Sequence, residues 1–497
     1  MLAKHYAHGQ THKNLVERDR CTSFRHRPHR TTADRCDVGQ VTIDILPDDV
    51  LLCIFNVHVN GPYKREEWHT LVHVSRRWRT LVFGSPHHLN LQLFCSIRTP
   101  VPKLDIWPAL PIVVYQHCFP EQNPDNLISA IKHNDRVCEI DFHSFFDRGQ
   151  LEKIVSMMQV PFPALTNLKL SFNEWGIEAV PVLPDLFLGR SAPRLQHLEL
   201  DGFSFPGLLN LLLSTTGLVS LELRGIPHSW YISPDAMVTH LSALTRLCSL
   251  TLEFDPRGSH PDRESRHSPP SARTLLPALT QLNFEGVNKY AEDLMTRIDT
   301  PQLDNLDMTF FNDTVLDISH LSQFISRHVP KFQAPNRALV AFSDDHIAAT
   351  LSFPAPRYER LVLGILCDES SGQISSLIQL CRPFLPAFAM VERLYIRLDE
   401  FGWPQRWKNG MQHFHWLQLL YLFTNAKDLY VSSKVTAYIV PVLKKLVGER
   451  ATEVLPALQN LFFHEFEVLS GPTAIEDFIT ARELSGHPIA VARWLSY

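Results

Sequence analysis

The sequence repeats a six-residue unit: an apolar residue, two variable positions, a second apolar residue, one variable position and a third apolar residue. A clear copy is Leu165-Thr166-Asn167-Leu168-Lys169-Leu170. The second apolar residues of the first seven copies lie 23 to 32 residues apart. These residues are Ile140, Leu168, Leu198, Leu221, Leu250, Leu282 and Leu306. A unit this short cannot bury its own apolar side, so neighbouring copies must stack against one another.

Further copies of the unit continue toward the end of the chain. Clear ones are centred on Leu361, Leu394 and Leu461, and weaker ones at 329–334 and 426–431 fill the longer gaps. We expect residues 89–95 and 112–115 to form irregular first strands. We expect a last helix at 474–484 and a last strand at 489–491.

Amphipathic segments separate the units, as expected if each strand is followed by a helix. The clearest are residues 125–133, 149–158, 206–213, 234–244 and 318–327. This spacing is typical of leucine-rich repeats. It predicts an α/β fold, a curved solenoid with a parallel sheet on the concave side and helices on the convex side. A doubly wound α/β domain also alternates strand and helix, but it would need a glycine-rich phosphate turn and fewer, longer units.

Residues 41–94 precede the repeats and carry a different, helical pattern. Pro47 suits the first position of a helix, and Asp48 and Asp49 place negative charge at its positive end. A second helix is expected from about residue 66, burying Trp68, Leu71 and Val72. A third is expected to carry Val74, Trp78, Leu81 and Val82 on one face. Three helices this short form too small a core to be robust alone.

In order and spacing, Leu46-Pro47, Ile54-Phe55, Val74-Ser75-Arg76-Arg77-Trp78 and Ser85-Pro86 resemble the F-box family. The resemblance covers about a tenth of the chain, and His88-Leu89 stands where F-boxes often have an aromatic residue. It implies docking to a SKP-type adaptor that links the chain to a cullin scaffold. The adaptor-facing positions that it implies are Leu46, Pro47, Leu51, Ile54, Phe55, Val74 and Trp78. The alternative is an ordinary three-helix cap of the repeats.

Together the two regions resemble F-box/leucine-rich-repeat proteins of the kind abundant in mushroom-forming fungi. The resemblance implies a substrate-recruiting subunit of an SCF-type ubiquitin ligase, with residues 95–497 holding a target protein for degradation. Two other hypotheses remain open: a repeat scaffold without a ubiquitin role, and an enzyme whose site is assembled from scattered repeat loops.

Composition limits the partners and the compartment. Lys+Arg number 47 and Asp+Glu 52, so the chain as a whole has no strong attraction to nucleic acid or an anionic membrane. Nine scattered cysteines without a CxxC pair favour free thiols in the cytoplasm or nucleus. The most apolar stretch, 416–423, is too short to span a membrane. Residues 1–40 form a basic arm, interpreted as a solvated tail, a nuclear import signal or a poor mitochondrial presequence.

Alternate residues of each unit should point out of the concave face. They are polar and lean acidic, and the positions expected to bind a target are Lys169, Glu199, Glu222 and Asp307. A sheet face that is merely soluble is an equally good interpretation. The polar segment 255–273 is a second candidate for partner contact.

Motifs for catalysis are missing from the sequence. It contains no Walker A motif, GxGxxG, GxSxG or HExxH, so we expect no cofactor and no catalytic residues. His69 and His73 have helical i, i+4 spacing but no nearby third ligand, so we expect no metal site.

Overall fold

A computed structural model describes most of the chain. The described residues are 43–59, 68–96, 108–116, 125–143, 148–172, 180–227, 230–256, 273–311, 316–328, 335–343, 346–353, 360–366, 370–398, 413–446, 448–464 and 475–494. The expected basic arm, the weak repeat copy at 329–334 and most of segment 255–273 lie outside them. The chain falls into two compact units, Met1–Ile54 and Phe55–Tyr497, so that residues 55–94 share a unit with the repeats.

The first unit contains the start of the first long helix. A short 3-10 turn, η1 (Ile43–Ile45), precedes α1 (Asp48–Val59). Helix α1 begins one residue after Pro47, whose carbonyl accepts the backbone N–H of Leu51 at 3.0 Å. Asp48 and Asp49 occupy its first turn, where the positive end of the helix dipole stabilises their negative charge. The predicted helix start is confirmed.

The second unit opens with the end of α1 and two shorter helices, α2 (Trp68–Val72) and α3 (Arg76–Gly84). The ring centroids of Phe55 and Trp78 lie 4.6 Å apart, and both side chains are buried. The Ser75 hydroxyl caps α3 by accepting the backbone N–H of Trp78 at 3.2 Å. Val74 was expected to lie on this helix, on the same face as Trp78. It instead precedes the cap and is 59% exposed.

The rest of the second unit is built on one large sheet. In spatial order its sixteen described strands are β1 (Leu93–Cys95), β2 (Ile112–Gln116), β3 (Val137–His143), β4 (Asn167–Ser171), β5 (His197–Asp201), β6 (Ser220–Ile226), β7 (Ser249–Phe254), β9 (Gln281–Gly286), β11 (Asn305–Phe311), β14 (Arg360–Leu366), β13 (His346–Ser352), β12 (Arg337–Phe342), β15 (Arg393–Leu398), β16 (Asp428–Val431), β17 (Asn460–His464) and β18 (Ala490–Trp494). A separate pair joins β8 (Thr274–Leu275) and β10 (Ile298–Asp299).

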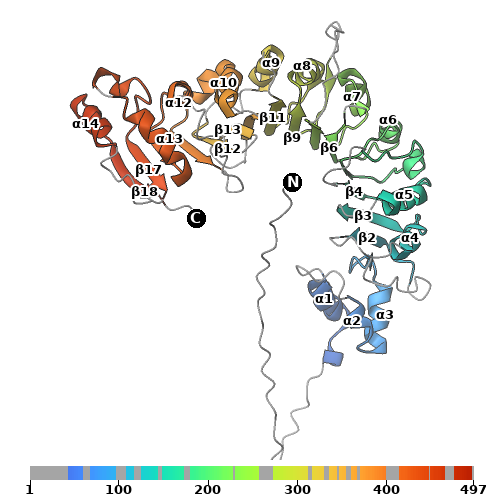
Figure 1. Cartoon of the computed structure of the whole chain (residues 1–497). Helices are drawn as coiled ribbons and strands as arrows, with labels where there is room; N and C mark the ends of the chain where they lie inside the picture. Colours follow the sequence, from blue (N-terminus) through green and yellow to red (C-terminus); the bar gives the residue numbers. More distant parts are fainter. Residues whose placement is uncertain are drawn as a thin grey trace, which may run out of the picture. The chain divides into compact units, whose positions relative to one another are not determined.

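Helices lie along the outer side of the strand array, and the strands form its inner side (Figure 1). They are α4 (Asp125–Ile131), α5 (Arg148–Met157), α6 (Leu208–Leu212), α7 (Pro234–Leu241), α8 (Asn288–Arg297), α9 (Ser319–His328), α10 (Ser370–Cys381), α11 (Leu385–Phe388), α12 (His413–Leu420), α13 (Ser433–Leu443) and α14 (Glu476–Leu484), with 3-10 turns η2 (Phe187–Arg190), η4 (Arg382–Phe384) and η6 (Gly448–Thr452). One strand with a helix or turn per repeat is the predicted leucine-rich-repeat architecture.

The second apolar residue of each unit aligns in register with that of the next strand. Leu168 pairs with Leu198, Leu198 with Leu221, and Leu221 with Leu250. All four are 0–1% exposed. The repeated unit therefore marks the strand positions that form the core between sheet and helices.

The sheet departs from the expected all-parallel arrangement at one place. Strand β13 pairs antiparallel with both β12 and β14, and β12 then continues parallel to β15. The 55-residue gap between Leu306 and Leu361 therefore holds a hairpin inserted into the sheet. The hairpin uses period-2 alternation, with Ala338, Val340 and Phe342 buried, rather than the repeated unit.

Buried polar groups join successive repeats on the helix side. The Glu292 carboxylate of α8 accepts the backbone N–H groups of His320 and Leu321, at 2.7 and 2.8 Å, at the start of α9. Arg482 of α14 is fully buried and donates to the carbonyls of Leu455 and Leu458, among others, at 3.3 and 2.8 Å. These bonds satisfy helix ends and loop carbonyls that would otherwise be buried without a partner.

The register predicts opposite outcomes for two neighbouring substitutions. Leu221→Asp places a carboxylate among buried leucines and should lower the free energy of unfolding by about 4 kcal/mol. Glu222→Gln, on the inner face, should cost less than about 1 kcal/mol. Thermal and urea unfolding of both variants measure this difference. Equal losses would contradict the register.

Candidate functional site: the polar inner face of the sheet

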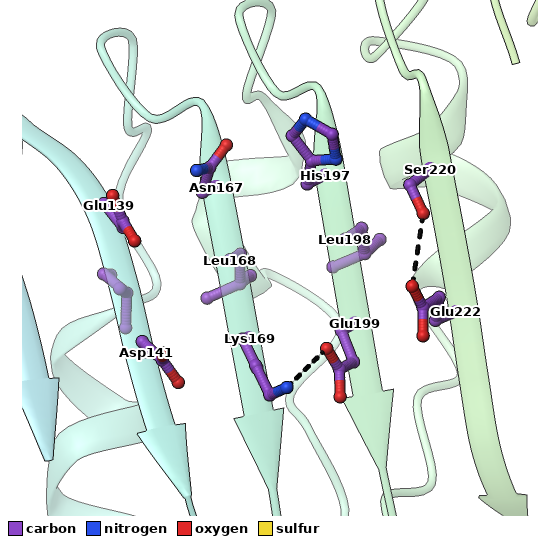
Figure 2. Close-up of a pocket in the computed structure, with 11 residues that line it drawn as sticks. Glu139, Asp141, Asn167, Leu168, Lys169, His197, Leu198, Glu199, Ser220 and Glu222 are labelled. Atoms are coloured by element: carbon purple, nitrogen blue, oxygen red, sulfur yellow. Dashed lines mark hydrogen bonds and ion pairs between the residues drawn. The ribbon is translucent and has the colours of Figure 1, made fainter. Parts of the chain in front are cut away.

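A shallow hollow of about 210 Å³ lies on the inner face of β3 to β6. It is lined by Glu139, Ile140, Asp141, Asn167, Leu168, Lys169, His197, Leu198, Glu199, Ser220 and Glu222, and we call it the acidic hollow. Figure 2 shows its polar side chains on four neighbouring strands. Four carboxylates face one lysine there, so it attracts cations. Its volume is below that of ordinary small-molecule sites and suits side chains of a partner.

The target-binding residues predicted in the hollow are joined by ion pairs within the chain. Lys169 Nζ lies 2.8 Å from Glu199 Oε2 on the adjacent strand (Figure 2). Glu222 Oε2 lies 3.0 Å from the guanidinium of Arg224. In-register parallel strands place Lys169 opposite Glu199, whereas Glu222 and Arg224 lie two residues apart on the same face of β6. These ion pairs hold the carboxylates of Glu199 and Glu222 in place before any partner arrives.

Asp307, the fourth predicted target-binding residue, lies elsewhere. Strand β11 is three strands from β6 in the sheet, so Asp307 does not line the acidic hollow. Its carboxylate lies 3.1 Å from the Arg360 guanidinium of β14. Burial raises the pKa of Asp307, and the nearby charges of Arg360 and His346 oppose that rise.

Three charged residues beside the hollow were missed from the sequence. Arg224 also lies 2.7 Å from Glu253 of β7, and Asp201 accepts the Ser171 hydroxyl at 3.0 Å. Burial raises the pKa of Glu253, although the charge of Arg224 opposes that effect. All three follow the third apolar residue of a unit. Continuing the alternation by one step would have placed them on the inner face.

The residues expected to face an adaptor differ in exposure. In the first unit, Leu46 is half-buried, Pro47 is exposed, Leu51 is fully buried and Ile54 is 41% exposed. In the second unit, Phe55 and Trp78 are buried and Val74 is exposed. Pro47, Ile54 and Val74 are thus accessible for direct contact, whereas Leu51, Phe55 and Trp78 are core residues.

The described ranges lack the side-chain groupings that metal binding needs. Within them, no group of three or more His, Cys, Asp or Glu side chains is placed to hold a metal ion. His69 and His73 are both exposed, and His73 lies just past the end of α2. Burial raises the pKa of the Cys95 and Cys138 thiols to about 11, so both stay protonated near neutral pH. No helix among the described residues is both long and apolar enough to span a bilayer.

Comparison with known proteins gives only distant similarity. No family model matches the chain, and no curated protein does. Among solved structures, the leucine-rich repeat-containing protein LegL7 of Legionella pneumophila is 14% identical, covering 68% of this chain and 95% of that one, with a TM-score of 0.27. An internalin (inlF) of Listeria monocytogenes is 13% identical, covering 78% and 86%, with a TM-score of 0.28.

Arg224 should stabilise the sheet because it holds carboxylates of two strands. Arg224→Met should lower the free energy of unfolding by about 1 kcal/mol, and by less when Glu253→Gln is already present. The matched control is Arg148→Met, which removes an exposed helix pair with Glu152 and should cost less than about 0.5 kcal/mol. A double-mutant cycle in urea measures the coupling. An equal cost in both backgrounds would contradict the bridging role.

Proposed function

We propose that this chain is the substrate-recruiting subunit of an SCF-type cullin–RING ubiquitin ligase. The observation that carries the proposal is which residues of the F-box pattern are buried and which are exposed. Phe55 and Trp78 form a buried aromatic pair, while Val74 stays exposed beside the capped start of α3. Val74 is therefore accessible for the adaptor contact that the F-box resemblance implies.

The helical segment is joined to the first repeats within the second unit. Trp68 Nε1 of α2 donates to the carbonyl of Gln92 at 2.7 Å, one residue before β1. Leu89 and Leu91, between α3 and β1, are buried. A rigid connection suits a receptor that holds its target at a fixed distance from a ubiquitin carrier, because proximity raises the local concentration of reacting groups.

In this proposal the target protein binds the acidic hollow through a basic segment. The hollow presents four carboxylates against one lysine, and opposite charge increases the rate and specificity of association. The protein would act in the cytoplasm or nucleus with a SKP-type adaptor and a cullin, without a cofactor or a catalytic residue of its own. Nucleic acid and membranes are not among the proposed partners.

Val74 supplies the test of adaptor docking. Val74→Asp should reduce co-purification of a SKP-type adaptor and a cullin at least tenfold, because a few apolar anchors dominate small interfaces. Val182→Asp is the matched control, since Val182 is 60% exposed on the repeats and should retain the adaptor. Mass spectrometry of the tagged, full-length chain measures recovery. If the unchanged chain recovers no adaptor, it is a repeat scaffold without a ubiquitin role.

A second test concerns the target. Glu199→Gln combined with Glu222→Gln keeps the shape of the hollow but removes two charges, so a basic target should be lost and its half-life should lengthen. Glu152→Gln removes one charge on the helix side and should change neither. Pull-down followed by a translation-block chase measures both effects. Retention of every partner by the double variant would place target binding elsewhere.

A further inference from the structure

One row of side chains on the inner face is polar at one end of the sheet and aromatic at the other. Successive strand pairings connect its members from β3 to β17. In spatial order they are Asp141, Lys169, Glu199, Glu222, Thr251, Asn283, Asp307, Val362, Thr350, Leu339, Tyr395, Tyr430 and Phe462. The row is thus polar from β3 to β11 and ends in three adjacent aromatic residues.

The last three residues, Tyr395, Tyr430 and Phe462, form a stack that we call the aromatic row. Ring centroids are 4.3 Å apart between Tyr395 and Tyr430, and 4.4 Å apart between Tyr430 and Phe462, with both pairs tilted by 9°. In-register strands lie roughly 4.8 Å apart, which sets this stacking distance. All three side chains are only partly buried.

Trp494 of the last strand extends the aromatic surface. Its indole packs edge-on against Tyr395 and Tyr430, with centroids 5.9 and 5.4 Å away, and is itself partly exposed. The aromatic row and Trp494 therefore form a continuous aromatic cluster from β15 to β18. The last two of these strands, β17 and β18, lie at the red C-terminal end of the chain in Figure 1.

Positive charge lies beside this surface. The Arg337 guanidinium lies 5.8 Å from the Tyr395 ring centroid. Arg393 of β15 is the in-register neighbour of Arg337 of β12. On the described parts of β12 and β15 to β18, the inner-facing carboxylate is Asp428, 3.9 Å from Arg393. This end of the inner face is therefore basic and aromatic, whereas the acidic hollow has the opposite charge.

The geometry favours a peptide over a single-stranded nucleic acid. Bases bind aromatic side chains by stacking on free ring faces. Here Tyr395 and Phe462 cover both faces of the Tyr430 ring, which leaves no free face at the centre of the row for a base to stack on. Ring edges carry partial positive charge and arginine pairs well with carboxylates.

We propose that the aromatic row, Trp494, Arg337 and Arg393 form a second docking site, which binds an extended acidic segment of a partner protein. An aromatic or aliphatic side chain of that segment packs on the exposed ring edges, and its carboxylates pair with the two arginines. The aromatic row spans two strand spacings, roughly 10 Å, which matches about three residues of an extended peptide. This site is independent of adaptor docking.

The probe is a random peptide library displayed on phage and selected on the intact chain. Besides any basic peptides that bind the acidic hollow, the selection should yield peptides that combine Asp or Glu with an aromatic or aliphatic residue. Synthetic copies should bind at least tenfold more weakly to the Arg337→Glu/Arg393→Glu variant and to Tyr430→Ala. Reversing the charge of these peptides to Lys should abolish binding at this site, so that any remaining affinity no longer depends on Tyr430.

A control variant separates the effect of charge at the proposed site from the effect of the chain's net charge on peptide affinity. Arg148→Glu alters a helix-side arginine with 46% side-chain exposure, close to the 44% of Arg393, and should leave peptide affinity unchanged. Arg337→Glu/Arg393→Glu alters exposed groups, so its melting temperature should stay near that of the unchanged chain. The proposal is overturned if no selected peptide is acidic, if the double arginine variant binds the acidic peptides equally well, or if oligodeoxythymidine binds in their place.

Discussion

The second apolar residues of the repeated units form a buried row of leucines between sheet and helices, and this row fixes which face of the sheet every other strand residue occupies. Side chains of a strand alternate between its two faces, so a slip of one residue would turn the leucines toward the inner face. Stacking Leu198, Leu221 and Leu250 in register prevents that slip, because each would lose its buried contacts at once. The same register brings Lys169 opposite Glu199 and Tyr395 opposite Tyr430. The inner-face chemistry thus follows from the packing beneath it.

Much of this arrangement was predictable from the sequence, since the repeated unit contains the register. Aligning successive copies by their second apolar residue gives the strands and the facing pairs, including Lys169 with Glu199. The hairpin β12–β13 was not predictable in this way. Ala338 replaces the usual large residue of the unit, and β13 (His346–Ser352) runs antiparallel, so neither strand repeats the spacing on which the prediction rested.

Sequence spacing alone could not separate contact residues from core residues in the helical segment. Phe55 and Val74 both belong to the F-box resemblance, yet one is fully buried and the other largely exposed. The start of α3 at Arg76, set by the Ser75 cap, leaves Val74 outside the helix. The aromatic row was visible as Leu394-Tyr395-Ile396 and its two successors. Its stacking could be recognised only once the strand order was known.

The two ends of the inner face are held at a set spacing by the strands between them. Where the inserted hairpin meets β14, the His346 ring lies over Gly364. A Cβ at residue 364 would come within 2.5 Å of His346 Nε2 and 2.6 Å of Thr309 Oγ1, so a larger residue there would displace these side chains. Six strands separate Glu222 from Tyr395, a path of roughly 34 Å along the sheet. An extended chain covers at most about 3.5 Å per residue. A single partner segment that followed this path to both proposed sites would therefore need its basic and acidic parts about ten residues apart. Shorter segments could occupy either site but not bridge them along the sheet.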